Sequence, residues 1–187
     1  MGGTSRLLTT AVLVGAAFVG SLVGATPASA YALNGCKLPS TSTTVYNGAS
    51  IAKYVTATNT AKSRWNAESQ PVTFTTASSA SSAKVWVTGI SAVDTYYAVT
   101  SGTCSSSGKW SGQVTVTWNS TGSSGLTTAQ LRMVAVHEFG HVLGLAHVSR
   151  TCSDTKSVMV QGTTKWTCDW GNDDPWADDV KGVNAIY

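Results

Sequence analysis

One stretch decides how this chain folds: His137-Glu138-Phe139-Gly140-His141-Val142-Leu143-Gly144-Leu145-Ala146-His147, which contains all three histidines. Helical side chains four residues apart leave the same face, so His137 and His141 can bind one metal ion at about 2.0–2.1 Å. Gly144 permits a reversal after the helix, which would bring His147 to the same ion. Three imidazoles leave a fourth position open, as in catalytic zinc sites, with Glu138 beside it as a proton acceptor.

The flanking residues predict that this motif lies on a buried helix. Thr127 and Gln130 have the spacing of a capping box, which marks a helix start. From Leu131 to Leu145 the segment is apolar on most sides, as a helix inside a core would be. Two other interpretations are a chance motif on an ordinary helix and a structural zinc site. The glycine and the third histidine argue against chance, and a structural site usually has a fourth protein ligand, often cysteine.

Residues 1–30 have the pattern of a secretory signal peptide, with a basic Arg6, a long apolar stretch and Ala-Ser-Ala at positions 28–30. We therefore expect cleavage before Tyr31, export, and one domain over residues 31–187. A permanent transmembrane anchor is the alternative, but no stop-transfer charge cluster follows. No later stretch is long or apolar enough to span a bilayer, so no membrane association is expected after cleavage.

Charge and cysteine content narrow the function classes further. The formal net charge is +3, which is too small to predict binding to nucleic acid or to an anionic membrane. Export makes two disulfides from the four cysteines the expected state. Of the three pairings, we favour Cys36–Cys104 with Cys152–Cys168. The second would close a short loop around Met159 and contribute about 3 kcal/mol in the chain-entropy model.

Hydrophobic periodicity predicts the remaining elements. Helical spacing indicates a first helix over Ala49–Ser69. Strand patterns follow at Val72–Phe74, Lys84–Ile90, Tyr96–Thr100 and Val114–Trp118. Asp174 and Pro175 have the order of an N-cap and a first helical position, and so predict the start of a last helix.

The histidine motif resembles that of the metzincin metalloproteases, in which a Met-turn follows it. The Met-turn candidate is Ser157-Val158-Met159, and residues 176–187 resemble the last helix of matrixin catalytic domains, with paired aspartates and a terminal Ile-Tyr. The closest resemblance is to secreted bacterial matrixin-like proteases. It implies an α+β zincin-like catalytic domain: a twisted mixed β-sheet with an active-site helix, an N-terminal helix and a C-terminal helix.

The same resemblance implies roles for the site residues. His137, His141 and His147 would bind one catalytic Zn²⁺ ion. Glu138 would be the general base for a zinc-activated water, and Met159 would pack beneath the metal.

The implied function is that of a secreted, monomeric zinc endopeptidase. It would hydrolyse peptide bonds of extracellular proteins, with polypeptides and not nucleic acid as partners. The alternative is a catalytically weak zinc-binding module that recognises proteins on a metzincin scaffold. The motif contains all three ligands and the glutamate, which favours the enzyme over the binding module.

The acidic residues near the C-terminus leave alternatives open. By the resemblance, one of Asp178 and Asp179 would fix the N-terminus or the site helix; otherwise both would lie on a solvated helix face. The run of Asp169, Asp173 and Asp174 is compatible with calcium. It lacks the spacing of a known calcium loop, so capping and solvation explain it more simply.

The chain departs from the matrixin pattern in three places. No histidine remains for a second, structural zinc, and residues Ser101–Ser111 carry none of the carboxylates of a calcium loop. Gln161 and Gly162 stand where matrixins have a Pro-x-Tyr wall, so the family's primary specificity pocket is not carried over to this chain.

Overall fold

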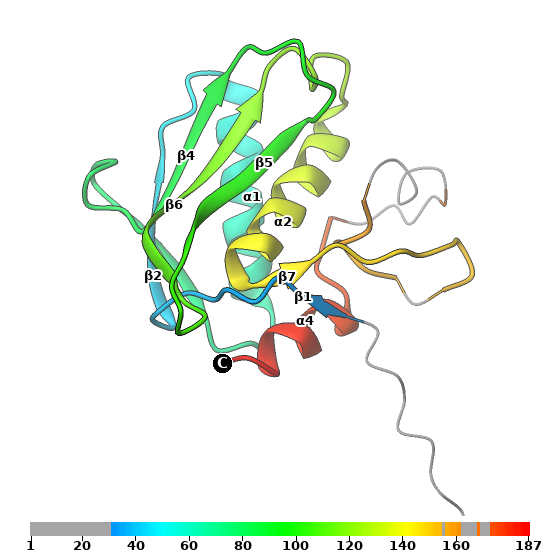
Figure 1. Cartoon of the computed structure of the whole chain (residues 1–187). Helices are drawn as coiled ribbons and strands as arrows, with labels where there is room; N and C mark the ends of the chain where they lie inside the picture. The colour runs from blue at the N-terminus through cyan, green and yellow to red at the C-terminus, as the bar shows by residue number, and fades with distance from the viewer. Residues whose placement is uncertain (1–30, 155, 162–167, 169–172) are drawn as a thin grey trace, which may run out of the picture.

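The computed structural model describes residues 31–154, 156–161, 168 and 173–187, and the expected signal peptide lies outside them. A five-stranded sheet with the order β3-β2-β4-β6-β5 forms its frame (Figure 1). The strands are β2 (Ser42–Asn47), β3 (Thr73–Thr76), β4 (Val85–Ile90), β5 (Ala98–Cys104) and β6 (Trp110–Asn119). β5 lies at one edge and is antiparallel to β6, whereas the other neighbours are parallel. The sheet is therefore mixed, as predicted.

β2 is a strand that the sequence analysis does not predict. Its first three residues, Ser-Thr-Thr, have the composition of a loop. In the structure Thr43 and Val45 point into the core, with 2% and 0% of their surface exposed. β2 pairs with β3 on one side and β4 on the other, so its backbone groups are satisfied by neighbours distant in sequence.

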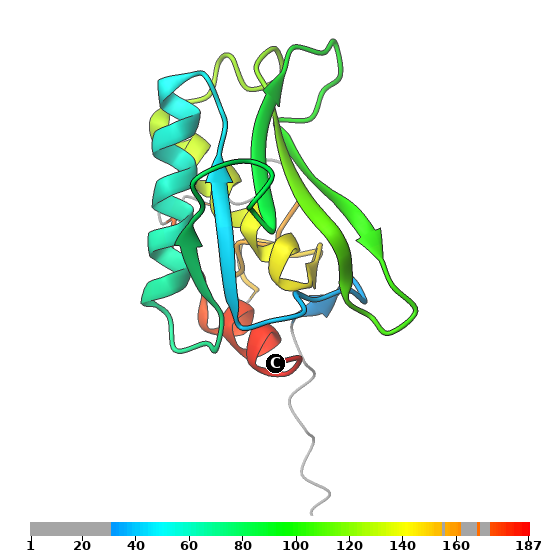
Figure 2. The same cartoon turned by 90° about the vertical axis from the view of Figure 1, so that its left-hand side faces the viewer.

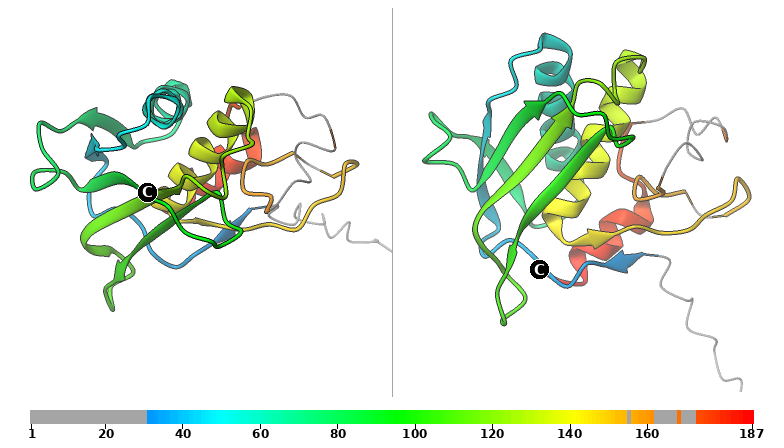
Figure 3. Two further views of the ribbon diagram at one scale, coloured as in Figure 1. Left: turned by 90° about the horizontal axis from the view of Figure 1, so that it is seen from above. Right: turned by 45° about the horizontal axis from the view of Figure 1, so that its top comes forward.

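Both long helices cover the same face of the sheet (Figures 2 and 3). They are α1 (Ala52–Ala67), shorter at both ends than predicted, and α2 (Thr128–Leu143). Trp65 of α1 is fully buried, and its indole N–H donates to the Val136 carbonyl of α2 at 3.0 Å. Phe139 on α2 is also fully buried, so the motif lies on a core helix. Among the described residues, no helix has both the length and the apolar composition to cross a bilayer.

Local sequence sets the two ends of α2. The Thr127 side chain accepts the Gln130 backbone N–H at 3.3 Å, and Gln130 reaches back, which confirms the capping box. At the other end, Gly144 caps the helix in the left-handed region, with φ +110°. The chain then enters β7 (Leu145–Ala146), which pairs antiparallel with β1 (Ala32–Leu33). The start of the described chain therefore lies beside the C-terminal end of α2.

The last helix begins later than predicted. α4 spans Ala177–Asn184 with Trp176 as its N-cap, so the prediction of an N-cap at Asp174 is wrong. The backbone N–H of Trp176 donates to Asp179 at 2.8 Å, so a carboxylate of the first helical turn closes the helix start. Asp174 is paired instead with Arg64 at 2.9 Å.

Two disulfides connect loops to this frame. Cys36 is bonded to Cys104, which joins the N-terminal segment to the end of β5. Cys152 is bonded to Cys168. These are the two pairs favoured in the sequence analysis.

Replacing Gly144 by alanine should destabilise the fold. A Cβ there would lie 2.8 Å from the backbone oxygen of Cys36, in a conformation that L-residues rarely adopt. We expect Gly144→Ala to lower the free energy of unfolding by about 1–3 kcal/mol. Gly125 is exposed and has nothing within 4 Å, so Gly125→Ala is the matched control, with a change within about 0.5 kcal/mol. Equal urea-unfolding curves for the two variants would contradict this account.

Candidate active site

The three histidines of the motif converge on one point. His137 and His141 come from successive turns of α2, and His147 comes from the segment after β7. Their Nε2 atoms are 3.1, 3.1 and 3.0 Å apart in pairs. His137 is buried, His141 is half-buried and His147 is exposed, so the cluster opens to solvent on one side.

Backbone carbonyls determine the tautomers of two of these rings. Nδ1 of His137 lies 2.8 Å from the Val158 carbonyl oxygen, and Nδ1 of His141 lies 2.8 Å from that of Leu145. Because a carbonyl only accepts, Nδ1 is the protonated nitrogen in both rings, and the lone pair of Nε2 faces the shared point. Contacts of this kind orient histidines that bind metals.

The histidine cluster fits a zinc ion. Neutral imidazole lone pairs that face one another at 3.1 Å repel unless a cation or a proton lies between them. A zinc ion can lie at its usual distance of about 2.0–2.1 Å from all three Nε2 atoms, because this distance is larger than the radius of the circle that passes through the three atoms. Three imidazoles without a thiolate are also the donor set of zinc sites that keep one position open.

Glu138 lies next to this cluster, on the same helix. Only 5% of its surface is exposed. The Thr100 hydroxyl of β5 donates to its Oε2 at 2.8 Å. The carboxylate lines the same cleft as the histidines and is therefore placed to accept a proton from a molecule bound there.

A cleft of about 790 Å³ holds these groups. α2 and β5 line it together with the N-terminal segment. Besides the histidines and Glu138, it is lined by Asn34, Cys36, Thr95, Tyr96, Tyr97, Ala98, Val99, Thr100, Cys104, Trp110, Val134, Val160 and Gln161. Since β5 is an edge strand, one of its sides faces away from the sheet.

Sequence reasoning did not identify three residues of this cleft. The Asn34 side-chain amide donates to the His141 carbonyl at 3.0 Å, and the Trp110 indole N–H donates to the Val142 carbonyl at 2.9 Å. Both donate to carbonyls of the last turn of α2, where the intrahelical hydrogen bonds end. The His141 carbonyl also accepts the backbone N–H of Gly144 at 3.1 Å. Thr100, whose hydroxyl donates to Glu138, is the third of these residues. No local motif marks these residues, because segments far apart in sequence bring them to α2.

The segment Ser157–Met159 passes beneath α2. Met159 is 2% exposed, and Gly140 leaves room for its thioether, since a methyl group at Gly140 would overlap the sulfur. The Met159 carbonyl accepts the backbone N–H of Val148 at 3.1 Å. The segment is therefore attached to the chain directly after His147.

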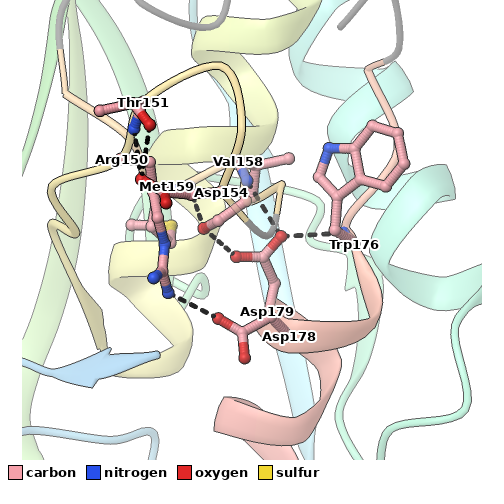
Figure 4. A network of polar contacts seen from close by, with 9 residues as sticks. Arg150, Thr151, Asp154, Val158, Met159, Trp176, Asp178 and Asp179 are labelled. Carbon is pink, nitrogen blue, oxygen red and sulfur yellow. Dashed lines mark hydrogen bonds and ion pairs between the residues drawn. The ribbon is translucent and has the colours of Figure 1, made fainter. Parts of the chain in front are cut away.

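Asp179 of α4 holds this segment in place (Figure 4). Its carboxylate accepts the Ser157 hydroxyl at 2.5 Å and the Val158 N–H at 2.9 Å, in addition to the Trp176 N–H. The Val158 carbonyl in turn accepts from His137, so one residue separates Asp179 from the histidine cluster. Burial raises the pKa of Asp179 to about 6, although the three hydrogen bonds oppose this shift.

Asp178, the other aspartate of the pair, binds the loop that follows His147. It pairs with Arg150 at 3.3 Å, as Figure 4 shows. Asp178 is 6% exposed and Asp179 is 1% exposed. The interpretation of both as a solvated helix face is therefore wrong.

The candidate calcium run has other partners in the structure. Asp173 pairs with Arg64 at 3.0 Å and with Arg132 at 2.6 Å, and Asp174 pairs with Arg64. Asp169 lies outside the described residues. These ion pairs connect α1 and α2 to the segment before α4.

Comparison with known proteins identifies relatives of this arrangement. Residues 103–187, which include the histidine motif and α4, match the Matrixin family model. A segment of 54 residues is 46% identical to human Matrix metalloproteinase-20; it covers 29% of this chain and 10% of the human protein. Two structures of myroilysin match with a TM-score of 0.52 and 15% identity, over 81% of this chain and 85% and 82% of theirs. The myroilysin likeness shows a shared fold.

The raised pKa of Asp179 predicts a pH-dependent stability. Between its ordinary value of 3.8 and about 6, the folded chain binds a proton that the unfolded chain has released. The contribution of Asp179 to the free energy of unfolding is therefore complete at low pH and is lost as the pH rises through 6. Asp179→Asn cannot titrate at this position.

We expect the stability of Asp179→Asn relative to wild type to improve by about 2 kcal/mol between about pH 4.5 and about pH 7. Urea unfolding of the metal-free chain at both pH values measures this difference. A stability difference between variant and wild type that is equal at the two pH values would contradict the prediction.

Proposed function

We propose that this chain, a matrixin-like zinc protease with a metzincin fold, is exported and hydrolyses peptide bonds of extracellular proteins. The observation that carries the proposal is the convergence of three histidine Nε2 atoms beside a buried glutamate, in a cleft bordered by an edge strand. The cluster fits zinc binding, and both the Matrixin match and the fold agree with this chemistry.

His137, His141 and His147 would hold one zinc ion through their Nε2 atoms. When bound, zinc supplies a Lewis acid that polarises the scissile carbonyl and makes water a stronger acid and nucleophile. Glu138 accepts a proton from the attacking water and delivers a proton to the nitrogen of the leaving amine. Met159, packed under Gly140, supports the turn of α2 from which the ligands project.

The position of β5 supports an extended polypeptide as the substrate. Its hydrogen-bonded partner in the sheet is β6, and its other side borders the cleft with Glu138. A peptide can add to such an edge as a further strand, with backbone hydrogen bonds that do not depend on its sequence. This mode would place a scissile bond between β5 and the histidine cluster.

Glu138→Gln tests the assigned general base. We expect hydrolysis of a quenched fluorescent peptide mixture to fall by about 10²–10⁴-fold, because the amide cannot take the proton, while one zinc ion per chain remains bound. Glu68, at the end of α1, gives the matched control Glu68→Gln, which should retain wild-type rates. A chelator should abolish wild-type cleavage, and added zinc should restore it.

Turnover of Glu138→Gln close to wild type would refute the role of Glu138. A wild-type chain that binds zinc and cleaves no peptide would instead favour the alternative, a protein-recognition module on the same scaffold.

Export is supported by the pattern of residues 1–30 and by the two disulfides, which form in oxidising compartments. Expression in a secreting host should therefore release a chain whose first residue is Tyr31, as read by N-terminal sequencing of the medium fraction. Replacing Ala28 and Ala30 by bulky residues should block this cleavage. Recovery of an uncleaved chain in the membrane fraction of the unaltered protein would contradict the proposal.

A further inference from the structure

Thr100 makes two contacts with a single residue of α2. Its hydroxyl lies 2.8 Å from Oε2 of Glu138 and 3.0 Å from the backbone carbonyl of the same residue. Thr100 belongs to β5, the edge strand, and its side chain points inward to α2 and lines the cleft. One side chain thus connects the strand that borders the cleft to the carboxylate inside it.

The chemistry of this contact fixes the orientation of the carboxylate. A threonine hydroxyl has one proton and two lone pairs, so it donates to one of the two oxygens at a time and can also accept. A bond from a hydroxyl to an ionised carboxylate is among the stronger hydrogen bonds of proteins. Because only 5% of the Glu138 surface is exposed, little water competes for this hydrogen bond.

The contact also sets the register between strand and helix. The carbonyl of Glu138 belongs to the rigid backbone of α2, whereas its carboxylate is mobile about the side-chain torsions. The same hydroxyl lies within hydrogen-bonding distance of the carbonyl and of the carboxylate. It therefore keeps the carboxylate at a defined position relative to the backbone of α2 and to β5. A peptide aligned on β5 would then meet the carboxylate at a defined position.

We propose that Thr100 is a positioning residue for the reaction: through its hydroxyl it holds Glu138 in register with a substrate bound along β5. This inference rests on the proposed function. It assigns Thr100 no contact with the reacting atoms. The competing explanation is that Thr100 only packs β5 onto α2, a role in which its methyl group would matter as much as its hydroxyl.

Three variants separate the two roles. Thr100→Val removes the hydroxyl and keeps the shape, Thr100→Ser keeps the hydroxyl and removes the methyl group, and Thr117→Val makes the same change on β6, away from the cleft lining. We expect Thr100→Val to lower kcat by about tenfold or more with KM within about twofold, because the loss falls on the chemical step. Thr100→Ser and Thr117→Val should stay within about twofold of wild type, and all variants should bind one zinc ion per chain.

A second measurement tests the contact without any hydrolysis. In the metal-free chain, a double-mutant cycle of Thr100→Val and Glu138→Ala on urea unfolding should show a coupling of about fivefold or more in the unfolding equilibrium constant. The same cycle with Thr117→Val should show none.

A Thr100→Val variant with wild-type kcat, or a Thr100→Ser variant as impaired as Thr100→Val, would overturn the positioning role while leaving the peptidase intact. An absent coupling would overturn the contact itself. A wild-type chain that cleaves no peptide would overturn the proposed function, and the role of Thr100 in the reaction would fall with it.

Discussion

The constraint on which the rest of this structure depends is the approach of three imidazole nitrogens to within 3.1 Å of one another. A helix can supply only two of them, because residues four apart share a face and the next such residue lies a further turn away. The third must return from outside the helix. Gly144 turns the chain, β7 directs it, and His147 completes the cluster. Since the Nε2 lone pairs of His137 and His141 repel each other, contacts around these rings have to hold them together.

Much of that support comes from α4, a helix that lines no part of the cleft. Asp179 acts at once as the cap of α4 and as the anchor of the segment beneath the histidine helix. The ion pair between Asp178 of α4 and Arg150 likewise anchors the loop after His147. Burying two carboxylates is unfavourable by itself, and each is therefore matched by donors or by an opposite charge. Residues that do not line the cleft thus help to hold His137 and the loop after His147 in place.

What could be predicted from the sequence is what depends on short-range physics. The histidine spacing, the capping box at Thr127 and the turn at Gly144 each involve residues a few positions apart, and the structure contains all three. β2 was missed because its hydroxyl-rich sequence is stabilised by strands on both sides rather than by its own pattern. The start of α4 was misplaced because Asp174 has a distant partner, Arg64, which competes with its capping role. Thr100 gave no signal, since neither its type nor its spacing distinguishes it from the many other threonines of the chain.

The Cys36–Cys104 linkage joins the N-terminal segment to β5, and both cysteines line the cleft. In a reducing cytoplasm such a pair stays as thiols, and non-covalent contacts, including hydrogen bonds to α2 and β7, hold the segment in place. The wall of the cleft is covalently closed only in an oxidising compartment. Completion of the cleft wall thus depends on the redox state of the surroundings, and a chain exported as proposed would acquire the closed wall only in the oxidising compartment where the disulfide forms.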